Sequence, residues 1–175
     1  MEEPKTVRFD ELDLDASTTL FSMTCHPRFR DPRPYAWADF SVGTQFTYRL
    51  DLAGEDAESV LSAASKSLRR EVADARELDL TVEREGIEAV KRIFENTRDR
   101  YAEQGETFPQ TWPYVHDLFE ALGERARVYV ARDGDGAFLT GITVLYSPQE
   151  AYFWQGGSRT IHDGVAVNSL LHWHV

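Results

Sequence analysis

The sequence predicts an α+β fold of three layers, in which helices flank one mixed β-sheet. Short segments with apolar side chains at every second position, typical of strands, are interspersed with longer segments whose apolar side chains recur every three or four residues, typical of helices. Hydrophobic residues make up 42% of the 175-residue chain, which is enough for one ordinary core. This composition excludes a disordered protein and a disulfide scaffold.

The first fifty residues contain few helix signals. Three of the seven prolines fall within residues 25–34, so we expect a loop there rather than a helix or a central strand. Residues 45–52 alternate in polarity and predict a strand. The apolar positions of that strand are Phe46, Tyr48, Leu50 and Leu52. With so little apolar content, this part of the chain is not expected to fold alone.

The next segment changes to a helical period. One stripe of apolar side chains predicts a single helix over residues 55–77, and its members are Val60, Leu61, Ala64, Leu68, Val72 and Ala75. A short strand is predicted over residues 80–84. A second helix starts at Ile87, with apolar side chains at spacings of three and four, and ends near Gly105.

The signals of a third helix lie at its ends. Thr111 can cap the N-terminus, Pro113 is tolerated in the first turn, and Gly123 suits the position after the C-terminus. The chain then turns to strands, which we expect over residues 127–131 and 137–146. The Asp-Gly-Asp-Gly sequence between them predicts a tight hairpin connection.

Two elements close the sequence. Residues 151–155 predict a further strand, which Gly156 and Gly157 end. After an irregular segment, a last apolar helix is expected to begin at Val167 and to run to the end of the sequence.

The charge of the chain bears on its partners. Nineteen basic and thirty acidic residues give a formal net charge of −11, so the surface repels nucleic acid backbones and DNA is not an expected partner. Only three basic residues are lysine, and an acidic surface poor in lysine is what adaptation to high salt would produce. We therefore hypothesise a halophilic protein.

Other sequence features bear on the compartment. No segment approaches the roughly 18 consecutive apolar residues of a membrane span, and the acidic start differs from the basic start of a signal peptide. The single cysteine, Cys25, fits a reducing compartment. We expect a cytoplasmic location.

The predicted order from residue 80 is strand, helix, helix, three strands and helix, with a hairpin joining the second and third strands. This order resembles the opening of the GNAT acyltransferase fold. Several segments resemble the FemAB-like branch of that family, whose members carry two GNAT domains in tandem and include aminoacyltransferases of peptidoglycan bridges. The segments that carry the resemblance are residues 31–40, 47–52, 65–70, 152–158 and 167–173.

Two departures from the family qualify the resemblance. Ordinary acetyl-CoA-dependent members have a glycine-rich pyrophosphate loop with the pattern Q/R-x-x-G-x-G/A, and residues 158–165 lack it. FemAB-like proteins are also roughly twice as long. The resemblance therefore implies a fragment: residues 1–52 would end a first GNAT-like domain, residues 53–79 would be a connecting helix, and residues 80–175 would begin a second domain without its C-terminal strands.

The resemblance also implies a function. A FemAB-like enzyme transfers an acyl or aminoacyl group directly to an amine acceptor on a cell-envelope precursor or a glycan. The donor would be acyl-CoA or aminoacyl-tRNA, no cofactor would be bound permanently, and no residue stands out as the catalytic base. Two alternatives remain open: a non-catalytic remnant that associates with itself or a partner through an exposed helix with Leu170, Leu171 and Trp173, and an ordinary acetyl-CoA-dependent N-acetyltransferase.

A basic group on the predicted helix over residues 55–77 is the first candidate substrate site. Lys66, Arg69 and Arg70 are spaced so that their side chains can converge, and by resemblance they lie near the cleft that holds the anionic part of the acceptor. The alternative is a solvated helix face paired to Glu71 and Asp74.

Further candidates lie at the end of the second predicted helix and around the last predicted strand. Arg98 and Arg100 are candidates for substrate contact, although pairing with nearby acidic side chains is the commoner role of such arginines. By resemblance, four residues flank the point where a GNAT sheet splays, where polar groups can bind an acyl carbonyl or an anion. They are Trp154, Gln155, Ser158 and Asn168.

No metal site is expected. His172 and His174 point to different sides of a helix, and the Asp-Gly-Asp-Gly segment is too short for the ligands of a calcium loop.

Overall fold

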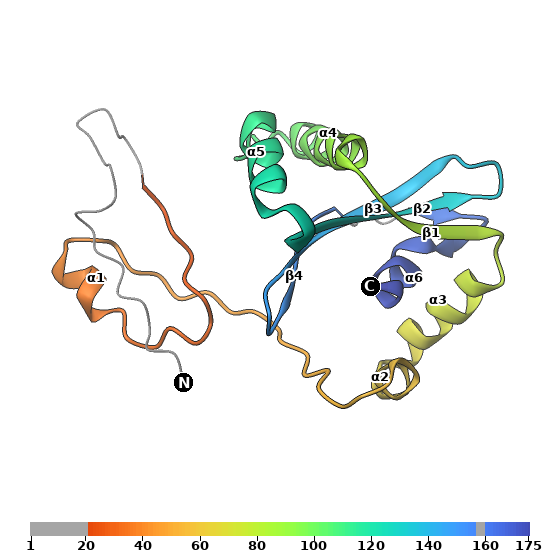
Figure 1. The fold of residues 1–175 in the computed structure, drawn as a ribbon, viewed down its shortest axis with the longest axis horizontal. Helices are drawn as coiled ribbons and strands as arrows, with labels where there is room; N and C mark the ends of the chain where they lie inside the picture. The colour runs from red at the N-terminus through yellow and green to blue at the C-terminus, as the bar shows by residue number, and fades with distance from the viewer. Residues whose placement is uncertain (1–20, 157–159) are drawn as a thin grey trace. The chain divides into compact units, whose positions relative to one another are not determined.

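The computed structural model describes residues 21–156 and 160–175 (Figure 1). The chain divides into two compact units, Met1–Asp51 and Leu52–Val175. The second unit contains every strand found in the described ranges and most of the helices. It therefore forms the sheet that the sequence predicts.

The first unit differs from its prediction in two places. Helix α1 spans Arg33–Trp37 and begins at the end of the segment expected to be a loop. Proline is tolerated there because Pro34 lies in the first turn, where no backbone N–H is needed. The strand predicted over residues 45–52 is not formed, and the Phe46 and Tyr48 side chains are 96% and 104% exposed. Alternation provides a strand with one apolar face, but a strand is stable only beside a neighbour.

The helix predicted over residues 55–77 is two helices, α2 (Ala57–Ala63) and α3 (Lys66–Arg76). Ala64 between them is extended, and the Ser65 Oγ accepts a hydrogen bond of 3.2 Å from the backbone N–H of Leu68. Ser65 thus caps a new helix in the middle of the apolar stripe, and such a cap competes with helix continuation.

The central sheet is antiparallel throughout the described residues. Its strands are β1 (Leu80–Glu85), β2 (Ala126–Asp133), β3 (Phe138–Tyr146) and β4 (Ala151–Gly156), paired in that order. All four correspond to predicted strands. The predicted α+β class is confirmed, since helices lie on both faces of this sheet (Figure 1).

Helices α4 (Ile87–Glu103) and α5 (Trp112–Leu122) cover one face of the sheet. The predicted ends of α5 are confirmed: Thr111 Oγ1 accepts from the N–H of Tyr114, and Gly123 follows the helix with a positive φ of 52°. A short 3₁₀ turn, η2 (Gly123–Arg125), leads into β2. The buried residues shared by these helices and the sheet are Ala89, Val90, Ile93, Phe94, Val115, Val128 and Val130.

Helix α6 (Val167–His174) covers the other face, and α3 packs against it. Leu171 is fully buried beside Ile142 and Val144 of β3. The Ser169 Oγ donates a 2.6 Å hydrogen bond to the Glu71 carboxylate of α3, which joins the two helices.

Two expectations about this region are corrected. The final helix is not exposed at Leu171, and the Trp173 ring lies 5.4 Å from the guanidinium of Arg76, so the helix exposes less apolar surface than the sequence predicts. The segment before α6 is not wholly irregular. It forms a small hairpin of β5 (Ile161–His162) and β6 (Val165–Ala166) around a turn at Asp163 and Gly164.

On the α6 face, the hydroxyls of Tyr129 and Tyr146 lie 3.2 Å apart. Burial raises the pKa of Tyr146 to about 12, and the hydrogen bond with Tyr129 acts in the same direction. The guanidinium of Arg127 lies 4.6 Å from the Tyr146 ring. Tyr146 therefore stays protonated to a higher pH than a free tyrosine, and the two hydroxyls form a polar contact on the α6 face.

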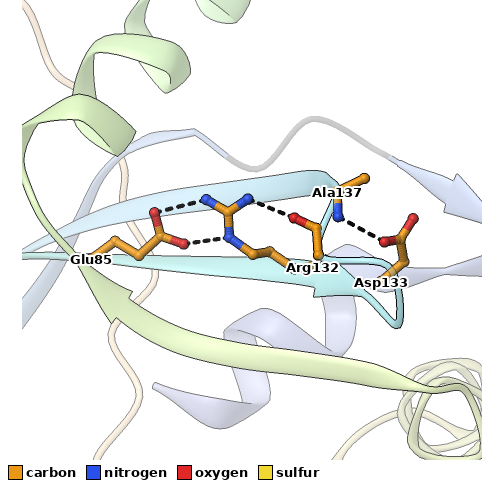
Figure 2. A network of polar contacts seen from close by, with 5 residues as sticks. Glu85, Arg132, Asp133 and Ala137 are labelled. Carbon is orange, nitrogen blue, oxygen red and sulfur yellow. Dashed lines mark hydrogen bonds and ion pairs between the residues drawn. The ribbon is translucent and has the colours of Figure 1, made fainter.

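A polar network holds the predicted hairpin between β2 and β3 (Figure 2). The Arg132 guanidinium donates two hydrogen bonds to the Glu85 carboxylate of β1, at 2.7 and 3.0 Å, and a third to the Gly136 carbonyl. Asp133 Oδ1 accepts from the N–H of Ala137 at 2.8 Å. Glu85 raises the pKa of Arg132, so the ion pair persists wherever Glu85 is ionised.

Candidate functional site

The end of β4 carries an irregularity in the sheet. Thr143 of β3 pairs with Gln155, and the next residue, Val144, pairs with Phe153, so Trp154 is an extra residue in a β-bulge. Trp154 packs against the core on the α4–α5 face, whereas the Phe153 ring lies 5.1 Å from that of His172 on the α6 face. A bulge re-aims the side chains around it. Here it directs two successive side chains, those of Trp154 and Gln155, towards the same face.

Gln155 is a buried polar residue with an incomplete set of hydrogen bonds. Its side chain is 5% exposed, and its Nε2 donates to Gln110 Oε1. The Oε1 atom of Gln155 and the Oγ1 atom of the adjacent Thr143 are buried without a partner in the described part of the chain. Leaving a buried polar atom unpaired costs about 1–3 kcal/mol, so these two atoms are candidates for hydrogen bonds to a ligand or to an ordered water.

Two glycines lie next to Thr143 and Gln155 at positions where a side chain would collide with its neighbours. Gly156 has a positive φ of 107°, and a side chain there would collide with the Gly141 carbonyl of β3. A side chain at Gly141 would in turn meet the Ile93 side chain of α4. Glycine is therefore required at Gly156 by both backbone conformation and space.

A pocket lies between α4 and this part of the sheet. It is a shallow depression, open to solvent, whose enclosed volume of about 10 Å³ holds roughly one water molecule. The sheet contributes Phe138, Gly141 and Gly156, and α4 contributes Asn96, Thr97 and Arg100 as its polar lining.

The start of α6 is the other polar feature near the end of β4. The N–H of Val167 donates to the Thr160 carbonyl, while no side chain caps the helix within the described residues. Asn168, in the first turn, has a buried Oδ1 without a partner in those ranges. The first turn of a helix presents free N–H groups, so this helix start can bind a carbonyl oxygen or an anion.

The structure keeps the predicted basic group apart. Arg69 turns back towards α2 and donates to the carbonyls of Ser62 and Ala64 at 2.9 and 2.6 Å. Arg70 pairs with Asp74 at 3.4 Å, as the alternative interpretation expects, and Lys66 makes no hydrogen bond to the described residues. These three side chains do not form a shared anion clamp.

The remaining candidates are divided between the pocket and the surface. Trp154 and Gln155 lie at the end of β4 on the α4–α5 face, next to the pocket residue Gly156, whereas Asn168 lies in the first turn of α6, on the other face of the sheet. Ser158 lies outside the described residues. Arg98 pairs with Asp99 at 2.8 Å and is not part of the pocket, which Arg100 lines instead.

Sequence reasoning missed several polar groups of this region. No sequence pattern marks Thr143 or Gln110 as a site residue. Thr143 is placed beside Gln155 by the bulge, and Gln110 contacts Gln155 across 45 residues of sequence. The choice between Arg98 and Arg100 could have been made from spacing: Arg100 follows the buried Ile93 by seven residues and Thr97 by three, which places it nearer the buried face of α4.

The described residues show neither a metal centre nor a membrane span. Within those ranges, no three histidine, cysteine or acidic side chains are grouped so that they could hold a metal ion. Likewise, none of the helices described is both long enough and apolar enough to cross a bilayer.

Comparison with known protein families gives a match over most of the second unit. The model of a family described as an acetyltransferase (GNAT) domain matches residues 62–175, which is more than half of the chain. The matched region includes α3, the four-stranded sheet, and helices α4 to α6. Comparison with curated proteins gives no match.

Proposed function

Because the chain belongs to the family of acetyltransferase (GNAT) domains, we propose that it transfers an acyl group to an amine in the manner of the FemAB-like branch. Membership of the family implies an acyl-CoA donor in general. The branch, the acceptor on an envelope precursor or glycan, and the alternative aminoacyl-tRNA donor belong to the proposal.

The observation that carries the proposal is the bulge at the end of β4. It brings the incomplete amide of Gln155 to a position one residue before Gly156, where the strand ends. An amine that attacks an acyl group presents N–H donors, and the unpaired Gln155 Oε1 is an acceptor for one of them. Gln110 holds the other end of the Gln155 amide and so fixes its orientation.

The reaction needs no covalent intermediate on the protein. The amine nitrogen attacks the thioester carbonyl, the new C–N bond forms, the C–S bond breaks, and the amine proton passes to solvent or a base while the thiolate leaves. The protein contributes position and stabilisation of the developing oxyanion. The free N–H groups at the start of α6 are suited to that charge.

Charge favours acyl-CoA over aminoacyl-tRNA as the donor. A formal net charge of −11 opposes a large RNA surface, whereas one small anionic donor needs only a local site. We also propose that residues 1–52 end a first GNAT-like domain, a segment whose boundary lies within one residue of the division between Asp51 and Leu52.

The test is acyl transfer by the purified full chain. Acetyl-CoA and longer acyl-CoA are supplied with small amines and amino sugars, and released CoA thiol and acylated product are measured. Transfer should appear, and Gln155→Leu should lower kcat/KM about ten- to a hundredfold, the range for losing one or two positioned hydrogen bonds.

Gln149→Leu is the matched control, because Gln149 is exposed in the turn between β3 and β4 and should leave kcat/KM unchanged. Unchanged kcat/KM in Gln155→Leu would show that the Gln155 amide does not position the amine. A folded protein that transfers no acyl group from acyl-CoA or from aminoacyl-tRNA would support the non-catalytic alternative.

A further inference from the structure

Arg100 is the exception among the arginines of α4. The guanidinium of Arg92 lies 4.3 Å from the Phe138 ring, and Arg98 is paired with Asp99. Within the described ranges, the Arg100 guanidinium has no ion pair, no hydrogen bond and no aromatic partner, although the residue is half-buried. A half-buried guanidinium has five donors, and here they are available to an anionic ligand because no side chain of the described residues accepts from them.

The pocket that Arg100 lines contains no acidic side chain among its described residues. Its polar lining consists of Arg100, the amide of Asn96 and the hydroxyl of Thr97, and Thr97 Oγ1 already donates to the Ile93 carbonyl. Phe138 and the two glycines supply low-dielectric walls. In a chain with a net charge of −11, this pocket is a local site where an anion would contact the Arg100 guanidinium without a lining carboxylate to repel it.

The position of the pocket relates it to the proposed reaction. Gly156, which lines the pocket, directly follows Gln155, and Gly141 lies two residues from Thr143 on β3, or about 7 Å along the strand. A ligand anchored at Arg100 would therefore place groups a few bonds away beside the unpaired Gln155 and Thr143 atoms.

We propose that Arg100, assisted by Asn96, binds a carboxylate group of the amine acceptor, so that the acceptor is an amino acid, a peptide or an amino sugar acid. The planar guanidinium matches a carboxylate with two parallel hydrogen bonds. The identification of the ligand as the amine acceptor rests on the proposed function, but binding of a carboxylate at Arg100 is tested without catalysis.

The test uses a matched pair of probes, glycylglycine and glycylglycinamide, which differ in the C-terminal carboxylate. Each is titrated into the ¹⁵N-labelled full chain, and the arginine side-chain Nε–H and Gly156 backbone signals are followed by NMR. Glycylglycine should cause saturable shifts, and glycylglycinamide should bind at least about tenfold more weakly.

Variants assign the site. Arg100→Gln should weaken glycylglycine binding about ten- to a hundredfold, and Arg100→Lys, which keeps the charge and loses the fork, should weaken it less. Arg84→Gln is the control, since Arg84 lies on β1, outside the pocket, and is paired with Glu124 of η2. Unchanged binding in both Arg100 variants, equal binding of the two probes, or loss of binding in Arg98→Gln would overturn the assignment.

Two further outcomes separate the proposals. Inorganic phosphate that binds at Arg100 more tightly than glycylglycine would replace the carboxylate with a phosphate ligand and overturn the inference. If glycylglycine binds at Arg100 but no amine is acylated, the carboxylate site is supported and the proposed function is contradicted. Acyl transfer whose rate at limiting acceptor is unchanged in Arg100→Gln would support the proposed function and overturn the carboxylate site at Arg100.

Discussion

Gly156 is the residue on which the geometry at the end of β4 depends most directly. Gly156→Ala should destabilise the second unit by at least about 2 kcal/mol, because it combines strain at a φ of 107° with a collision against the Gly141 carbonyl. Denaturant unfolding followed by circular dichroism measures the loss.

The control for that substitution is Gly86→Ala. Gly86 lies at the start of α4 with a φ of −102°, and a Cβ there meets nothing within 4 Å. It should cost less than about 1 kcal/mol, the scale of a changed N-cap. Equal losses at the two glycines would show that the collision at Gly156 is relieved by a small backbone shift.

Tyr146 gives a pH dependence of stability. Its pKa is raised to about 12 in the fold against about 10 in the unfolded chain. The folded state therefore binds more protons above pH 10, and the stability contributed by Tyr146 should be complete below pH 10 and lost as pH rises to 12. Thermal unfolding between pH 9 and 12 should show a smaller decline in Tyr146→Phe than in the wild type. An identical decline would contradict the raised pKa.

The residues of the candidate site were predictable in part. The resemblance to the family singles out Trp154, Gln155 and Asn168, and their role in a site stays a prediction. The unpaired state of the Gln155 Oε1 atom could not be predicted from the sequence, because it depends on the bulge, which is a property of the register between two strands. Arg69 shows the opposite case: its helical spacing fits a clamp, yet the nearest acceptors are the carbonyls that the break at Ser65 exposes.

At the scale of elements, the ion pair between β1 and β2 is the contact that ties an edge strand to the sheet. The Arg132 and Glu85 side chains are 31% and 23% exposed, so Glu85→Gln should cost about 1–3 kcal/mol of unfolding free energy by leaving Arg132 without its charged partner. Denaturant unfolding again gives the value.

Asp99→Asn provides the comparison for that pair. Asp99 also accepts from an arginine, but Arg98 and Asp99 are 54% and 62% exposed, and solvent screens the interaction. The loss should be below about 0.5 kcal/mol. A cost at Asp99 as large as that at Glu85 would mean that burial does not govern the strength of these pairs.

Elements with signals at both ends were predicted well, and those that depend on a neighbour were not. Thr111 and Gly123 fix α5 locally, so its bounds follow from the sequence. The break at Ser65 replaces one helix with two because a cap hydrogen bond outweighs a continuous stripe. The segment 45–52 has the alternation of a strand, but no strand is formed in it.

At the scale of the molecule, net charge predicts a response to salt. With a formal charge of −11, repulsion among acidic side chains opposes the compact state, so KCl should raise the Tm. The rise should be steepest below about 0.3 M, where the Debye length shortens most. Circular dichroism at several KCl concentrations measures it, and a Tm that stays level or falls would reject the halophilic hypothesis.

The contacts of Gly141 and Gly156 differ in a way that affects how related sequences can change. A side chain at Gly141 meets the Ile93 side chain, which a smaller residue can replace, and the Tyr129 carbonyl at 3.2 Å, which has to give by only a few tenths of an ångström, so positions 93 and 141 can vary as a correlated pair. A side chain at Gly156 meets a backbone carbonyl, which no substitution can shorten. Evolution therefore has a compensating route at one glycine and none at the other, and position 156 should stay glycine in every homologue that keeps this strand pairing.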